Sequence, residues 1–70
     1  MMPLTLVDVG NDYTVLKVGG NAEIKRHLEN LGFVPGSEVS VINTIGGNVI
    51  VKIKEARVAI SKEMAQKIMV

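Results

Sequence analysis

The segment that decides the fold spans residues 28–39 and has the sequence Leu28-Glu29-Asn30-Leu31-Gly32-Phe33-Val34-Pro35-Gly36-Ser37-Glu38-Val39. Leu28 and Leu31 lie three positions apart, which places them on one face of a helix. Gly32 follows at the position where helices commonly end in a left-handed residue. Pro35 and Gly36 then predict a type II turn, because proline presets the first central φ and glycine accepts a positive second one. The segment therefore predicts a helix end, a tight turn and the start of a strand.

The sequence before this segment predicts the body of the helix. Asn21 is a favourable N-cap residue. Ile24 joins Leu28 and Leu31 at the i, i+4, i+7 spacing of an amphipathic helix face. We therefore expect a helix over residues 22–31.

Strands and tight turns account for most of the remaining chain. Gly46 and Gly47 predict a hairpin loop in which glycine supplies positive φ. Short antiparallel strands around a small aliphatic core most often close into a barrel, because closure removes exposed edges. The pattern predicts a mainly β fold, a small five-stranded barrel with one inserted α-helix and a short C-terminal helix. The expected strands span residues 13–18, 38–44, 49–54, 57–60 and 69–70.

Three details of this prediction involve residues outside the central segment. Thr5 and Asp8 have the spacing of a capping box, which predicts a helical turn over residues 5–9. Ser61 is expected to cap the C-terminal helix. The apolar residues of segment 13–18 fall on both faces of the expected strand. That pattern fits either a bulge or a strand that is buried on both faces.

The composition predicts one small domain, residues 1–70, with an aliphatic core. A chain of this size buries only about 60% of its unfolded surface, and this one has one Phe, one Tyr and no Trp. The lack of cysteine excludes disulfides and thiolate metal sites. A net charge of +1 and few aromatic residues argue against nucleic-acid binding. No apolar run approaches the roughly 20 residues of a membrane span, and the N-terminus lacks a signal-peptide pattern.

The only histidine, His27, has two interpretations. Glu23 precedes it by four residues on the same helix face, so the pair has a spacing that suits two metal ligands. A lasting site usually needs three or four protein ligands, so a solvated helical ion pair is the favoured interpretation. No nucleophile and base, and no pair of carboxylates, is spaced for catalysis. We therefore expect that the protein is not an enzyme.

The predicted contact surface for a partner consists of Lys25, Arg26, Phe33, Val34, Ile42 and Ile50. The two basic residues either contact an acidic surface or form a solvated helix face. The Phe-Val pair either projects as an apolar contact or folds back onto the end of the helix. The two isoleucines lie out of phase with the inward positions of their strands. They form an exposed patch unless the terminal helices cover them.

The chain resembles a known family in the motif Leu28-x-x-Leu31-Gly32-Phe33-Val34-Pro35-Gly36-x-x-Val39-x-Val41. This is the FeoA family, small cytoplasmic accessory proteins of bacterial ferrous iron transport. The resemblance implies a five-stranded SH3-like barrel with an inserted helix. Two departures affect turns: Glu55-Ala56 stands where family members usually have a glycine, and the loop at residues 45–48 is shorter than usual. The opening Leu4-x-x-Val7-x-x-Gly10 and the ending Arg57-Val58-Ala59-Ile60 with Ile68-Met69-Val70 also fit.

The resemblance implies an adaptor function and a partner. The partner is the large membrane permease FeoB, with its cytoplasmic GTP-binding domain, and the location is the cytoplasm. Neither nucleic-acid binding nor direct membrane insertion is expected. The alternative is a small transition-metal-binding regulatory module, because a related domain ends some metal-dependent repressors. No cofactor is predicted, the family motif supplies no metal ligands, and the alternative implies only weak binding of Fe(II) or another transition metal.

Overall fold

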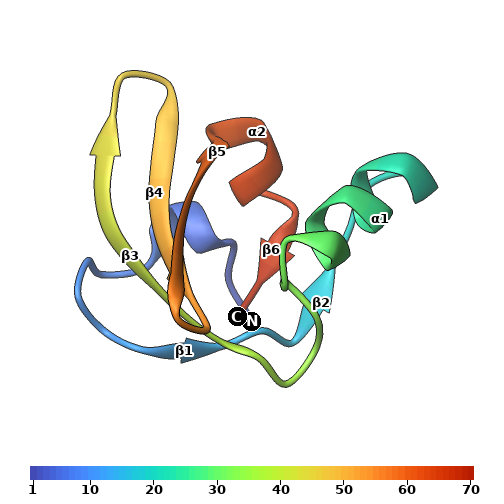
Figure 1. Cartoon of the computed structure of the whole chain (residues 1–70), viewed down its shortest axis with the longest axis horizontal. Coiled ribbons are helices and arrows are strands. Elements are labelled where there is room, and N and C mark those ends of the chain that lie inside the picture. The colour runs from blue at the N-terminus through green and yellow to red at the C-terminus, as the bar shows by residue number, and fades with distance from the viewer.

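Two antiparallel sheets and two α-helices make up the computed structural model, which describes residues 1–70 (Figure 1). The larger sheet has the strand order β1-β3-β4-β5, and the smaller one pairs β2 with β6. α1 is inserted between β2 and β3. In chain order the elements are the 3₁₀-helix η1 (Leu4–Leu6), β1 (Tyr13–Thr14), β2 (Lys17–Val18), α1 (Ala22–Asn30), β3 (Glu38–Ile45), β4 (Asn48–Ile53), β5 (Ala56–Ser61), α2 (Lys62–Ala65) and β6 (Ile68–Met69).

The end of α1 has the hydrogen bonds of a Schellman motif. The N–H of Gly32 donates to the Glu29 carbonyl at 2.9 Å, and the N–H of Phe33 donates to the Leu28 carbonyl at 3.0 Å. Gly32 adopts φ +109°, a conformation that L side chains rarely adopt. In the following turn Gly36 adopts φ +94°. The predicted left-handed helix end and the positive φ at Gly36 are confirmed.

The first expected strand is divided between the two sheets. In β1, Tyr13 pairs with Val39 of β3, and in β2, Lys17 pairs with Met69 of β6. Between them Val15 still bonds to the turn before β3, while the N–H of the next residue donates to Met69 at 2.8 Å. This change of partner explains why apolar residues fall on both faces of the segment. The SH3-like class fits, but six strands in two sheets replace the expected five-stranded barrel.

A β-bulge at Ile42 divides β3 into two halves. Val41 pairs with Val51, and Asn43 pairs with Ile50, which leaves Ile42 as the extra residue.

A side chain caps the N-terminus of each α-helix. The Asn21 side chain accepts from the N–H of Ile24 at 2.9 Å, and the Ser61 hydroxyl accepts from the N–H of Met64 at 3.2 Å. Both predicted N-caps are confirmed.

The predicted capping box at the N-terminus is wrong. The helical turn is η1, Leu4–Leu6, one residue earlier than expected and shorter. Pro3 precedes it, and no side chain caps it. The physical reason is burial: Leu4 is 1% exposed and belongs to the core, which fixes the start of the turn. The capping spacing of Thr5 and Asp8 is therefore not used.

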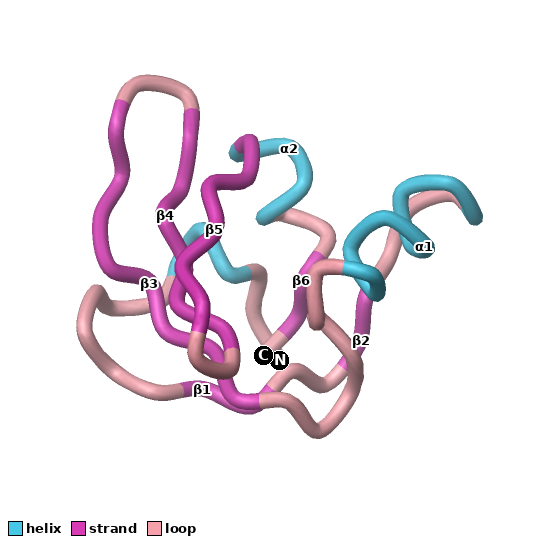
Figure 2. Tube along the Cα trace, in the orientation of Figure 1, coloured by secondary structure: helices cyan, strands magenta, loops and turns pink.

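The core lies between the two sheets and is aliphatic apart from Phe33. It comprises 13 buried residues drawn from η1, both sheets, both helices, the segment between β1 and β2, and the turn before β3. The chain ends lie side by side (Figure 2), where Met2 and Val70 exchange two backbone hydrogen bonds of 2.9 Å. Neither helix has the length and apolar composition needed to span a bilayer. The predicted aliphatic core is confirmed.

Candidate docking surface

The solvent side of α1 presents the two predicted basic residues. Lys25 and Arg26 are both exposed, whereas Ile24 is half-buried and Leu28 fully buried on the opposite side of the helix. This division follows from the amphipathic spacing of α1, which turns its apolar positions to the core. α1 therefore leaves both cations free to contact another molecule.

The predicted metal pair lies on the same helix, beside α2. Glu23 and His27 are exposed and line a depression together with Ile24, Arg26, Asn30 and Met64. The guanidinium of Arg26 borders this depression, and its charge opposes cation binding there. Nowhere does the fold bring three or more His, Asp or Glu residues together for a metal ion. The residues present do not fit a lasting transition-metal site, which needs more protein ligands.

Phe33 is not available as a contact residue, which corrects the prediction for this position. It is 0% exposed and belongs to the core cluster. The reason is the Schellman motif, in which the residue after the left-handed glycine packs against the residue four positions before that glycine. Here that partner is Leu28, which is also 0% exposed. Val34 follows at the surface and is half-buried.

The two isoleucines lie on the outer face of the larger sheet. Ile50 points away from the core, because its neighbours Val49 and Val51 are both buried. Its cross-strand partners Asn43 and Ala59 are exposed, so the row stays accessible from both sides. Ile42, at the bulge beside Asn43, is half-buried like Ile50. The structure brings the two isoleucines to neighbouring positions on an open face.

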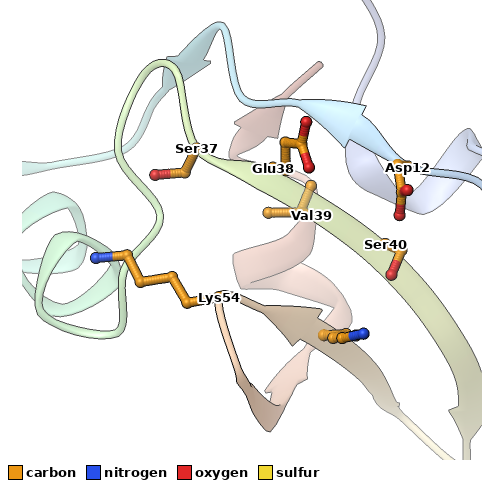
Figure 3. Close-up of a pocket in the computed structure, with 7 residues that line it drawn as sticks. Asp12, Ser37, Glu38, Val39, Ser40 and Lys54 are labelled. Atoms are coloured by element: carbon orange, nitrogen blue, oxygen red, sulfur yellow. The ribbon is translucent and has the colours of Figure 1, made fainter.

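Next to this row the outer face becomes strongly polar, a feature that the sequence analysis missed. Ser40, Lys52 and Arg57 form the adjacent cross-strand row, so two cations lie directly opposite each other. A polar groove of about 310 Å³ lies beside them. In Figure 3 the carboxylates of Asp12 and Glu38 lie on the side of β1 and β3, across from Lys54. The alternation of polar residues within β3 and β4 was a signal for this groove, but only the register places the strands together.

These features define a class: a small SH3-like β domain with an inserted helix and open, shallow surfaces in place of an enclosed pocket. A family model described as the FeoA domain matches residues 2–70, and the chain belongs to the FeoA family. A relative from Methanocaldococcus jannaschii, named "Putative Fe(2+) transport protein A", is 33% identical over 70 residues. The match covers 100% of this chain and 85% of that protein.

Solved structures share the fold. An iron uptake regulatory protein, FeoA, superposes with a TM-score of 0.86 at 25% identity, over 96% of this chain and 89% of that one. FeoA of Stenotrophomonas maltophilia, solved with zinc and described as an SH3 domain protein, gives 0.85 at 27% identity, over 99% and 88%. A manganese-dependent transcriptional repressor gives 0.85 at 23% identity, over 94% of this chain and 38% of that one. The last similarity concerns the fold alone.

Proposed function

We propose that this protein is a non-enzymatic adaptor of ferrous iron transport. It acts in the cytoplasm, where it docks on a FeoB-type permease and modulates the assembly or activity of that permease. Membership of the FeoA family supports a role in this transport system, as does a relative named for Fe(2+) transport. The observation that supports docking is the accessible row on the outer face, where Ile42 and Ile50 lie beside the cations Lys52 and Arg57.

The physical argument for docking is the composition of this outer face. Protein interfaces combine an apolar centre with a polar rim. The isoleucine row supplies an apolar centre, and the adjacent row of Ser40, Lys52 and Arg57 supplies a charged rim. On α1 the exposed cations Lys25 and Arg26 are accompanied by the exposed carboxylates Glu23 and Glu29, so this helix adds no net charge. A partner with an acidic, partly apolar surface is complementary to the outer face.

The test is a pair of substitutions, one within the isoleucine row and one outside the larger sheet. Ile50→Thr keeps a β-branched side chain in β4 and removes apolar area at the centre of the row. We expect affinity for the soluble domain of the permease to fall about tenfold, which corresponds to a loss of about 1.4 kcal/mol in binding free energy. Leu6→Thr is the control, because Leu6 is 70% exposed on η1, outside the larger sheet. It should bind with unchanged affinity.

Titration calorimetry measures both affinities, and thermal unfolding confirms that both variants fold. Equal affinities for Ile50→Thr and the wild type would remove the isoleucine row from the docking surface. If the wild-type protein binds neither the soluble domain nor the intact permease in detergent, the adaptor proposal itself fails.

The alternative of a metal-binding regulatory module has less support. Glu23 and His27 are the only candidate ligands, and no third His, Asp or Glu joins them. The similarity to a manganese-dependent repressor concerns the fold alone. Titration of Fe(II) or Zn(II) into the wild type and into His27→Ala separates the two proposals. Metal binding that disappears in the variant would favour the regulatory module.

A further inference from the structure

The outer strand β5 has a row of backbone groups without partners. β5 is the last strand in the sheet order, and it pairs only with β4. The N–H of Lys62 donates to the Gly47 carbonyl at 3.1 Å, so these two opposite residues form a hydrogen-bonded pair. In an antiparallel ladder, hydrogen-bonded and non-hydrogen-bonded pairs alternate along the two strands. The N–H and C=O groups of Arg57 and Ala59 therefore point away from β4, and no backbone bond outside the strands involves them.

This edge has one charged side chain, Arg57, but lacks most other devices that usually protect an edge strand. Such devices include short strands, proline, bulges and inward-pointing charges. β5 is six residues long, contains no proline, and keeps an unbroken register with β4. At the opposite side of the sheet, β1 is only two residues long and β3 contains the bulge at Ile42. β5 is thus the regular and accessible edge of the sheet.

The two sides of this edge differ in chemistry. On the inner side Val58 is half-buried although it faces the core, and it packs against the core cluster as Ile24 and Met64 do. Two depressions that share Ile24 and Met64 lie between α1 and α2, and one of them reaches Ser61 of β5. In Figure 1, β5 lies on the side of the sheet that is turned toward these helices. The inner side of the edge therefore offers Val58 as a partly exposed apolar side chain, beside depressions that are lined mainly by polar residues.

On the outer side the edge is basic. The side chain of Arg57 lies there, directly opposite Lys52 of β4, and Lys54 follows in the adjoining turn. Like charges directly opposite each other in a ladder repel. An added anion next to Arg57 relieves this repulsion. The outer side therefore favours acidic side chains.

We propose that the β5 edge binds an extended segment of a partner protein as an additional strand, and that apolar and acidic residues alternate in this segment. Strand addition uses main-chain hydrogen bonds for affinity and alternate side chains for specificity. The apolar positions cover Val58 on the inner side, and the acidic positions lie beside Arg57 on the outer side. This inference deepens the proposed function and rests on it only for the identity of the partner.

The probe is a synthetic peptide of about seven residues that alternates valine and glutamate. The variant Ala59→Pro removes one edge N–H, which the β4 ladder does not use, so the strand tolerates it. Ala59→Val is the matched control, because it keeps the N–H and suits a strand. We expect the wild type and Ala59→Val to bind the peptide alike. Ala59→Pro should bind about tenfold more weakly, because a hydrogen bond is lost and the ring blocks pairing.

Amide exchange in the wild-type protein gives a readout that needs no variant. The peptide should slow exchange at the N–H groups of Arg57 and Ala59. A peptide with lysine in place of glutamate should bind more weakly than the acidic one, and Arg57→Glu should reverse that order. Slowed exchange along β3 instead of β5 would overturn the proposal. Equal binding to the wild type and Ala59→Pro would also overturn it.

The permease domain, measured in parallel, separates this proposal from the proposed function. If that domain binds the wild type and Ala59→Pro equally well, the edge proposal fails while docking stands. If the peptide binds β5 and the domain binds nowhere, the edge proposal stands and the permease is not the partner. Absence of binding by both ligands overturns both proposals.

Discussion

Phe33 joins the inserted helix to the larger sheet. Its N–H closes the helix end on the Leu28 carbonyl, and its ring is fully buried. It is also the largest of the fully buried side chains and the only aromatic one in the core. In a small domain with an otherwise aliphatic core, one such ring supplies much of the packing between elements.

Replacement of Phe33 by alanine should unfold a large part of the population. Truncation of a buried phenylalanine costs about 3–5 kcal/mol, and small domains have total stabilities of only about 5 kcal/mol or less. Urea denaturation followed by circular dichroism measures the loss. Phe33→Leu is the control and should cost clearly less, because it keeps most of the apolar volume. A stable Phe33→Ala protein that lost only its affinity for the permease would contradict the assignment of Phe33 to the core.

Lys54 is the one non-glycine residue with positive φ, at +56°. It begins the turn between β4 and β5, where Ile53 pairs with Ala56. A left-handed conformation costs an L-residue about 1–2 kcal/mol, a cost that glycine avoids. The turn between β4 and β5 therefore carries this backbone cost at Lys54, the residue before Glu55.

The variants Lys54→Gly and Lys54→Ala isolate this backbone cost, because both remove the side chain. We expect Lys54→Gly to be more stable by about 1 kcal/mol, as measured by the midpoint of urea unfolding. The same pair at Glu55, which lacks a positive φ, provides the control. There alanine should be the more stable residue, because glycine costs more conformational entropy. The same order at both positions would contradict the strain at Lys54.

At the scale of elements, the two-stranded sheet holds both chain ends. β6 pairs with β2, Pro3 bridges to Met69, and Val70 exchanges two hydrogen bonds with Met2. Without β6, the segment before α1 would lose its partner strand, and η1 would lose the contact that fixes the N-terminus. The smaller sheet therefore depends on the last few residues of the chain.

Deletion of Met69 and Val70 should strongly destabilise the protein. It removes the acceptor for the N–H of Leu16 and both hydrogen bonds to Met2, and each such bond contributes about 1 kcal/mol. The unfolding midpoint in a thermal scan measures the effect. Val70→Ala is the control: it keeps the backbone bonds, so it should lower the midpoint much less. Equal losses in the two variants would show that side-chain burial, and not strand pairing, holds the chain ends.

At the scale of the whole molecule, exposed cations lie on two separate surfaces. α1 presents its cations to solvent on one side. The outer face of the larger sheet combines the isoleucine row with Lys52 and Arg57 on the other. β5 runs between them with a free edge. This arrangement offers a partner several shallow contacts, which suits an adaptor better than a protein that encloses a small ligand.

Part of the candidate surface could be predicted from the sequence. Exposure of Lys25 and Arg26 follows from helical spacing alone. The position of Ile50 opposite Ala59, and of Lys52 opposite Arg57, depends on the register between strands. In a hairpin the turn fixes the register, and the two-residue turn Lys54-Glu55 differs from the turn expected between residues 54 and 57. The docking row and the polar groove were therefore only partly predictable.

The sequence by itself determined the inserted helix, its end at Gly32, the turn at Gly36 and the aliphatic nature of the core. These features depend on backbone preferences of single residues and on apolar spacing within one element. Only the tertiary structure decided the division of residues 13–18 between two sheets, the packing of Phe33 among core residues from both sheets and the free edge of β5. These three features depend on contacts between residues far apart in the chain, whose free energies no local sequence pattern contains.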